Sequence, residues 1–145
     1  MLKSINLFLE SRRDYAGIFI RLIIGWRLIA GVWSYVSQSK PITEVVDYFT
    51  MLHLPAPLFG AYLSVYAQFM CGILFIIGLW IRPAAIVMII NFAVAIIAAH
   101  LHDGIEKSFA AWIMLAASFF FLFNGAGKIS LDEAFQRRHT NKIIK

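Results

Sequence analysis

The stretch that decides the fold is APLFGAYLSVYAQFMCGILFIIGLWI, residues 56–81, which contains no charged residue and no histidine. A helix rises about 1.5 Å per residue and the hydrocarbon core of a bilayer is about 30 Å thick, so about 20 apolar residues cross it. Two more uncharged runs occupy residues 83–99 and 108–127. Runs of this length predict membrane helices rather than the core of a soluble domain.

The composition agrees with a protein that lies mostly in lipid. Hydrophobic residues make up 61% of the chain and charged residues 14%, whereas an ordinary soluble domain is about half apolar and about a quarter charged. The 145 residues leave room for one domain, residues 1–145, and for no separate soluble catalytic domain. Cys71 is the only cysteine, which excludes a disulfide within the chain and a C-x-x-C dithiol relay.

We therefore predict an all-α fold, an integral membrane four-helix bundle with short interfacial helices. One interfacial helix is expected over residues 1–14, where a short apolar patch is followed by polar residues. The predicted transmembrane helices cover about residues 15–36, 57–81, 83–101 and 108–123.

Shorter signals predict what lies between and after these helices. Pro83 has no N–H to donate and suits the first turn of a helix, so Arg82-Pro83 is expected to form a tight join between the second and third spans. The loop over residues 37–56 holds a stretch with an apolar face, which predicts a short amphipathic helix at the interface. Ser130 and Glu133 have the spacing of a capping box and predict a helix start.

The positions of the basic residues predict the orientation. Apart from Arg21 and Arg27 in the first span, lysines and arginines gather in both tails and at Arg82, and the opposite side of the predicted bundle has only Lys40 and Lys107. By the positive-inside rule both termini are cytoplasmic, in a bacterial inner (cell) membrane. The net charge of +5 is thus explained by the membrane, and no nucleic-acid partner is expected.

Three polar residues stand out as candidates to bind a ligand within the membrane. Arg27 is near the middle of the first span, where an arginine costs at least about 2.5–3.5 kcal/mol and should face the bundle interior, a water pocket or a carboxylate. Gln68 interrupts the second span, and His100, which titrates near neutral pH, ends the third. Arg27, Gln68 and His100 are predicted to line one intramembrane pocket; the alternatives for Arg27 are a structural ion pair and a local bilayer defect. Arg21 is closer to the inner edge, where its side chain can extend toward the interface.

A metal site is not predicted. His100 and His102 are followed by Asp103 and Glu106, which at first suggests ligands for an ion. Residues two apart on a helix point to nearly opposite sides, however, so the two histidines would share an ion only if the helix ended between them.

Several of these segments resemble the DoxX family of small membrane proteins. The most specific is Gly125-Ala126-Gly127-Lys128-Ile129-Ser130-Leu131-Asp132, which is close to the family's G-x-G-[RK]-x-S-L-D. The chain departs from the family pattern at Gln68, where a glutamate is common, and at Trp33-Ser34-Tyr35, which replaces a G-x-x-K ending. The other matching positions are Arg21, Leu22, Gly25, Leu54-Pro55-Ala56-Pro57, Gly72, Leu74, Gly78, Arg82, His100 and Gly104.

The resemblance implies a four-helix membrane bundle associated with redox enzymes, because a subunit of thiosulfate:quinone oxidoreductase is of this type. One hypothesis is therefore an accessory or quinone-facing subunit of a membrane redox system, with membrane lipid and oxidoreductase subunits as partners. Quinone is the ligand to expect, and no other cofactor is evident. The alternative is a non-catalytic membrane module, namely an assembly factor, a lipid-binding protein or a scaffold. The sequence shows no complete catalytic constellation, so it does not decide whether the protein is an enzyme.

Overall fold

The described part of the chain is built from helices. The computed structural model describes residues 2–100, 105–127 and 129–134, and the side chains of residues 17–98, 108–127 and 129–134. The elements, in chain order, are α1 (Leu2–Val36), α2 (Thr43–Met51), α3 (Pro57–Ile77), α4 (Ile81–Ala95), the π-helix η1 (Ile96–His100) and α5 (Ile105–Asn124).

Three of the described helical segments are long and apolar enough to cross a membrane, namely Gly17–Val36, Pro57–Ile77 and Ile81–Ala98. The apolar helix Ser108–Asn124, within α5, is shorter. Large apolar side chains cover the outside of the bundle; Ile23, for example, is 67% exposed and Phe59 68%. An outer surface of this kind requires lipid, since soluble proteins rarely expose large contiguous apolar patches. The prediction of an all-α membrane bundle is confirmed.

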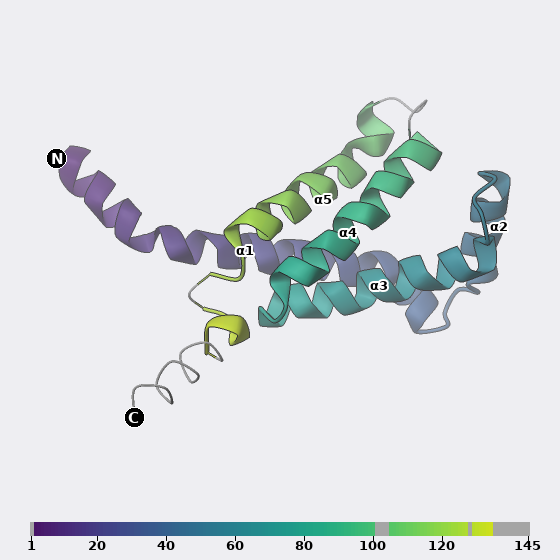
Figure 1. Cartoon of the computed structure of the whole chain (residues 1–145), viewed down its shortest axis with the longest axis horizontal. Coiled ribbons are helices and arrows are strands. Elements are labelled where there is room, and N and C mark those ends of the chain that lie inside the picture. Colours follow the sequence, from purple (N-terminus) through teal and green to yellow (C-terminus); the bar gives the residue numbers. More distant parts are fainter. Residues whose placement is uncertain (1, 101–104, 128, 135–145) are drawn as a thin grey trace.

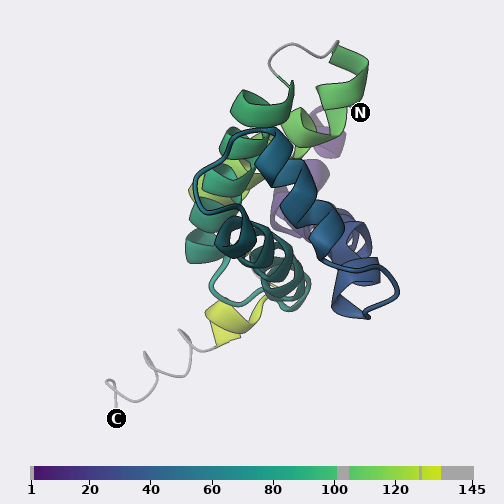
Figure 2. The same cartoon turned by 90° about the vertical axis from the view of Figure 1, so that its right-hand side faces the viewer.

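The long helices pack as two pairs. Helix α1 packs on α3 and α5 packs on α4, while α3 and α4 join the pairs and α1 and α5 barely touch. Figure 1 shows α4 and α5 side by side, crossing the direction of α1 and α3. Helix α2 crosses the end of α3, as Figure 2 shows from that side. We call this the distal end, and the opposite end, formed by residues 17–21, 78–82, 124–127 and 129–134, the basal end.

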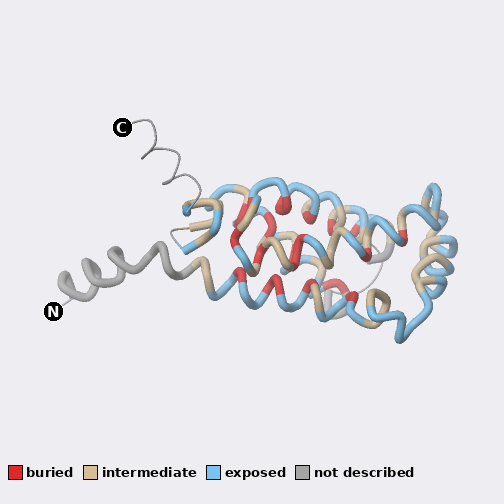
Figure 3. The backbone as a smooth tube through the Cα atoms, turned by 90° about the horizontal axis from the view of Figure 1, so that it is seen from below, coloured by how far each residue is buried: buried red, intermediate tan, exposed pale blue. Residues whose placement is uncertain are grey.

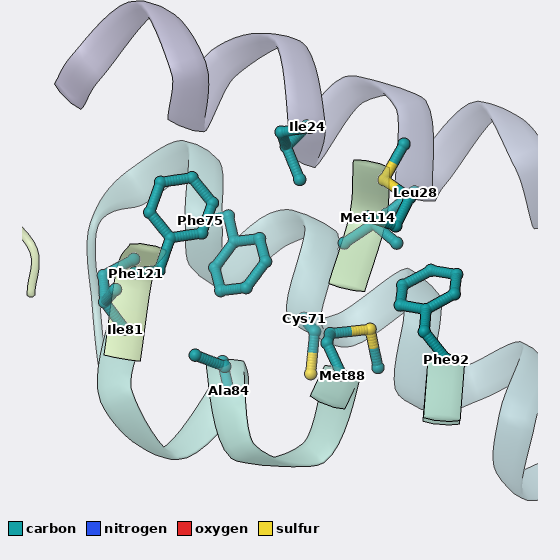
Figure 4. Close-up of a cluster of buried hydrophobic side chains, with 11 residues drawn as sticks. Ile24, Leu28, Cys71, Phe75, Ile81, Ala84, Met88, Phe92, Met114 and Phe121 are labelled. Atoms are coloured by element: carbon teal, nitrogen blue, oxygen red, sulfur yellow. The ribbon is translucent and has the colours of Figure 1, made fainter. Parts of the chain in front are cut away.

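The core lies where the two pairs meet. Figure 3 shows the buried residues on the facing sides of the helices. Phe75 and Phe121, both fully buried, place their rings 4.8 Å apart between α3 and α5. The remaining buried members include Ile24 and Leu28 from α1 and Ile81, Met88 and Phe92 from α4 (Figure 4).

Two glycines let α1 and α3 approach closely. A Cβ added at Gly25 would lie 2.7 Å from the carbonyl oxygen of Gly72, and one added at Gly72 would lie 2.9 Å from the carbonyl oxygen of Gly25. Atoms at these distances clash, so the two backbones touch only because neither residue has a side chain.

Helix α1 differs from the expected arrangement. It runs unbroken from Leu2 to Val36, so residues 2–14 continue the membrane helix instead of forming a separate interfacial one. At about 1.5 Å per residue its 35 residues extend roughly 50 Å, well beyond a hydrocarbon core of about 30 Å. The polar residues of this part favour water or lipid head groups over hydrocarbon, but they are compatible with a helix and do not end it.

The turn between α3 and α4 also differs. Helix α3 ends at Ile77, Gly78 takes the left-handed conformation with φ +73°, and α4 already begins at Ile81. The join is therefore residues 78–80 rather than Arg82-Pro83, and Pro83 lies within the first turn of α4. Glycine after the last helical residue is a common helix end, because only glycine adopts positive φ without strain.

The amphipathic helix expected within residues 37–56 is confirmed as α2. Val45, Val46 and Phe49 are partly buried, whereas Glu44 and Asp47 are exposed. The apolar face thus packs toward α3, where the ring of Phe49 lies 3.2 Å from the position of a Cβ added at Gly60.

Candidate functional site: a cavity among the long helices

A cavity of about 260 Å³ lies among the four long helices. Leu28, Phe92 and Met114 form its inner wall and belong to the buried core, at the side of the cluster farther from Phe121 in Figure 4. The other lining residues are Arg27 and Gly31 from α1, Gln68 from α3, Ala95 from α4, and Ala110 and Ala111 from α5.

The cavity is open on one side. Three of its lining residues, Arg27, Gly31 and Ala110, are exposed, and they belong to α1 and α5. These two helices barely touch each other, so the mouth lies between them. In a membrane such a mouth faces the lipid.

Arg27 brings a positive charge to this cavity at mid-span. It is the eleventh residue of the 20-residue span Gly17–Val36. Its Nη1 lies 2.8 Å from the position of a Cβ added at Gly31, so the side chain extends along α1 over a residue that offers no side chain. Within the part of the chain that the structure describes, the guanidinium makes no hydrogen bond or ion pair.

Gln68, from α3, lines the same cavity and belongs to a short series of hydrogen-bonded polar groups. Its Nε2 donates to Ser64 Oγ at 3.2 Å, and Ser64 Oγ donates to Asn91 Oδ1 at 2.8 Å. All three side chains are partly buried between α3 and α4. These two hydrogen bonds fix the Gln68 amide beside the cavity, because Ser64 belongs to α3 and Asn91 to α4, and the two helices pack together.

The structure thus places two of the three predicted site residues along one cavity, Arg27 and Gln68. For the third, His100, it describes only the backbone, at the end of η1, and the side chain lies outside the described residues. His102 and Asp103 also lie outside them, as does the Glu106 side chain. Among the described residues no group of three histidine, cysteine, aspartate or glutamate side chains could hold a metal ion.

The lining of the cavity offers groups that can bind a ligand. Arginine supplies donors and a charge, and glutamine supplies one donor group and one acceptor group. The rest of the lining is apolar, and no carboxylate, thiol or imidazole is among the lining residues described. An apolar pocket with a few convergent polar groups is the usual form of a small-molecule site.

A second polar cluster, at the basal end, was missed by the sequence reasoning. Arg21 is only 3% exposed. Its Nε donates to the Phe75 carbonyl at 3.0 Å and its Nη2 to the Ile76 carbonyl at 3.4 Å. Its Nη1 donates to the carbonyls of Ala126 and Ile129, the latter at 3.0 Å. One side chain therefore ties α1 to the end of α3 and to the segment after α5.

Asp132 completes this cluster by capping α4. Its carboxylate accepts from the backbone N–H of Trp80 at 2.9 Å and of Ile81 at 3.3 Å, and its own N–H donates to the Gly78 carbonyl at 3.1 Å. A carboxylate at a helix N-terminus satisfies free N–H groups and suits the helix dipole. The predicted cap at Ser130 is also present, since Ser130 Oγ accepts from the Glu133 N–H at 3.2 Å.

Gly78 is required at the centre of this basal cluster. A Cβ there would lie 2.6 Å from Arg21 Nη2 and 2.8 Å from the Ser130 Cβ, besides the strain of its positive φ. Arg21, Gly78 and the pair Ser130 and Asp132 are thus brought together from three segments far apart in the sequence. These residues matched separate positions of the family motifs. The sequence did not show that they meet, because the acceptors of Arg21 are backbone carbonyls, which no side-chain pattern reveals.

Comparison with known proteins places these residues in a family. No curated protein and no solved structure matches the chain. The family model of DoxX matches residues 17–101, more than half of the 145 residues. The matched stretch contains Arg21, Arg27, Gln68 and Gly78, so it includes the cavity lining from α1, α3 and α4 and part of the basal cluster, and it ends before α5. The chain belongs to the DoxX family.

Proposed function

We propose that this protein binds the head group of a quinone in its lateral cavity and acts as an accessory or quinone-facing subunit of a membrane redox system. The observation that carries the proposal is Arg27, a mid-span guanidinium with no described partner, at the mouth of a cavity that opens between α1 and α5. A central arginine costs at least about 2.5–3.5 kcal/mol, and a polar ligand oxygen reduces that cost.

The size and lining of the cavity suit a ring with its tail outside. Its volume of about 260 Å³ is just below the range of about 300–1,000 Å³ usual for sites that enclose a whole ligand. Phe92, Leu28 and Met114 offer an apolar wall for a flat ring, while Arg27 and Gln68 offer hydrogen bonds to its oxygens. An isoprenoid tail would leave through the mouth into the lipid.

The proposed setting is a bacterial inner membrane with both termini in the cytoplasm. Its support is the charge pattern, with basic residues gathered in the tails and at Arg82. Since the cavity lining described contains no redox-active group, electron transfer would need a partner, and the proposed partners are oxidoreductase subunits.

The test is binding of a short-chain benzoquinone to the full chain in lipid nanodiscs. Arg27→Ala should weaken saturable binding about ten-fold or more, because hydrogen bonds to charged groups contribute about 1.5–3 kcal/mol. Arg82→Ala is the matched control, since Arg82 is exposed at the basal end and does not line the cavity. Quinone binding that is absent, or equal in the Arg27→Ala and Arg82→Ala variants, would contradict the proposal.

The alternative is a non-catalytic membrane module, such as a lipid-binding protein, an assembly factor or a scaffold. The observation that favours it is that the family-motif residues Arg21, Gly78 and Asp132 serve structural contacts. Under this alternative Arg27 would hold the phosphate of an anionic lipid. Binding measured in nanodiscs with and without phosphatidylglycerol distinguishes the two functions. If the protein retains that lipid tightly, loses it in Arg27→Ala, and does not release it when quinone is added, the non-catalytic module is favoured.

A further inference from the structure

The direction of the hydrogen bonds behind Gln68 restricts what the cavity can bind. A serine hydroxyl has a single hydrogen to donate. Ser64 gives that hydrogen to Asn91 Oδ1, at 2.8 Å, so toward Gln68 its oxygen can only accept. Gln68 accordingly turns its NH₂ group toward Ser64, at 3.2 Å.

The consequence for the cavity is an acceptor on the α3 wall. One hydrogen of the Gln68 NH₂ group is given to Ser64, and the amide oxygen of Gln68, which has no hydrogen bond within the described residues, can accept from a ligand. Arg27, on the α1 wall, carries donors only. A ligand that pairs with both the Arg27 guanidinium and the Gln68 oxygen therefore needs an acceptor for Arg27 and a donor for that oxygen.

We propose that Ser64 and Asn91 are positioning residues that make the cavity select a head group with a hydroxyl donor, so that it binds a quinol in preference to a quinone. This inference rests on the proposed function, because it concerns the same cavity and ligand class. A phenolic hydroxyl donates to the Gln68 oxygen, and the head group's oxygens accept from Arg27. A quinone head has carbonyl oxygens only, which satisfy Arg27 but leave the Gln68 oxygen without a partner.

The experiment compares a short-chain benzoquinol, kept reduced without air, with the matching benzoquinone on the full chain in nanodiscs. We expect the wild-type protein to bind the quinol about five-fold more tightly or better, the effect of one ordinary hydrogen bond. Ser64→Thr keeps the hydroxyl and should keep the ratio. Ser64→Ala removes the constraint and should bring the ratio close to one.

Asn91→Ala is the most discriminating variant, because it should abolish or reverse the preference for quinol over quinone. Without Asn91 the Ser64 hydroxyl is free to donate to the Gln68 oxygen, so the amide turns and presents its NH₂ to the cavity. The quinone should then bind at least as well as the quinol. A purely structural role of Asn91 would weaken both ligands together and leave their ratio unchanged, and melting temperatures show whether each variant is folded.

Each result bears on a separate claim. Equal binding of the two forms to the wild-type protein, or preference for the quinone, overturns this inference while leaving the proposed function intact. A wild-type preference that survives in both Ser64→Ala and Asn91→Ala overturns the roles of those two residues. No saturable binding of either form contradicts the proposed function and this inference together.

Discussion

The two arginines of α1 show how differently one residue type can be accommodated in a membrane. Arg21 is buried and donates to carbonyl oxygens at the ends of α3 and after α5. Arg27, six residues on, lines an open cavity and has no partner among the described residues. The first arrangement is that of a structural contact, and the second leaves donors available to a ligand.

Arg21→Ala should destabilise the protein by at least about 2 kcal/mol, because it leaves buried carbonyls at the basal end without their donor. Arg21→Lys should recover only part of this, since an ammonium group cannot reproduce the planar fork. Thermal unfolding in detergent measures both. Arg82→Ala, at an exposed position of the same end, serves as control and should stay within about 0.5 kcal/mol of wild type. Equal stability of the Arg21→Ala and Arg82→Ala proteins would show that the Arg21 contacts contribute nothing.

The difference between the arginines could not be predicted from the sequence. From the sequence Arg21 could be judged only by its depth in the span, because its acceptors are main-chain oxygens, which every residue carries and no pattern displays. Arg27 and Gln68 were selected because polar residues are costly within apolar runs. Ala95, Ala110 and Ala111, which line the same cavity, gave no signal, because which face of each helix turns inward depends on packing.

At the scale of elements, the pair of α1 and α3 depends on a backbone contact. Gly25→Ala should cost about 1–3 kcal/mol, because its Cβ would lie 2.7 Å from the Gly72 carbonyl oxygen and from the Ile76 side chain, forcing the helices apart. Gly17→Ala is the matched control on the same helix, where the nearest atom, Asn124 Nδ2, is an ordinary 3.6 Å away. There the gain in helix propensity should leave stability unchanged or slightly higher. Thermal unfolding of the two variants side by side gives the comparison, and a Gly25→Ala protein as stable as wild type would mean that the helices separate freely.

The elements themselves were largely predictable, and the errors have physical causes. Uncharged runs located α3, α4 and α5, and the apolar face within residues 37–56 located α2. The start of α1 was misjudged because a change from apolar to polar residues was taken for a change of element, although a helix needs no apolar residues to continue. At the α3–α4 join Pro83 was given more weight than Gly78, yet proline also fits inside the first turn of a helix, while glycine fits the left-handed residue that ends one.

At the scale of the whole molecule, the structure makes the accessibility of its two ends testable. Ser39 is exposed in the connection between α1 and α2 at the distal end, and Ala134 is exposed in the segment after α5 at the basal end. With Cys71→Ala as background, a cysteine at Ser39 should react with an impermeant thiol reagent on intact cells. Ala134→Cys should react only after the cells are opened, because the orientation predicted from the lysines and arginines in the sequence puts this end in the cytoplasm. Labelling of both from the same side would contradict a transmembrane arrangement of these two ends.

The basal cluster affects which positions of this sequence tolerate substitution. Ala126 and Ile129, the two variable positions of the G-x-G-[RK]-x-S-L-D signature, hold Arg21 through their carbonyl oxygens. Since every amino acid supplies that atom, substitutions at these two sites can accumulate silently while the anchor remains. A survey of sequence variation alone would therefore overlook the two residues to which the most deeply buried arginine described in the chain is attached.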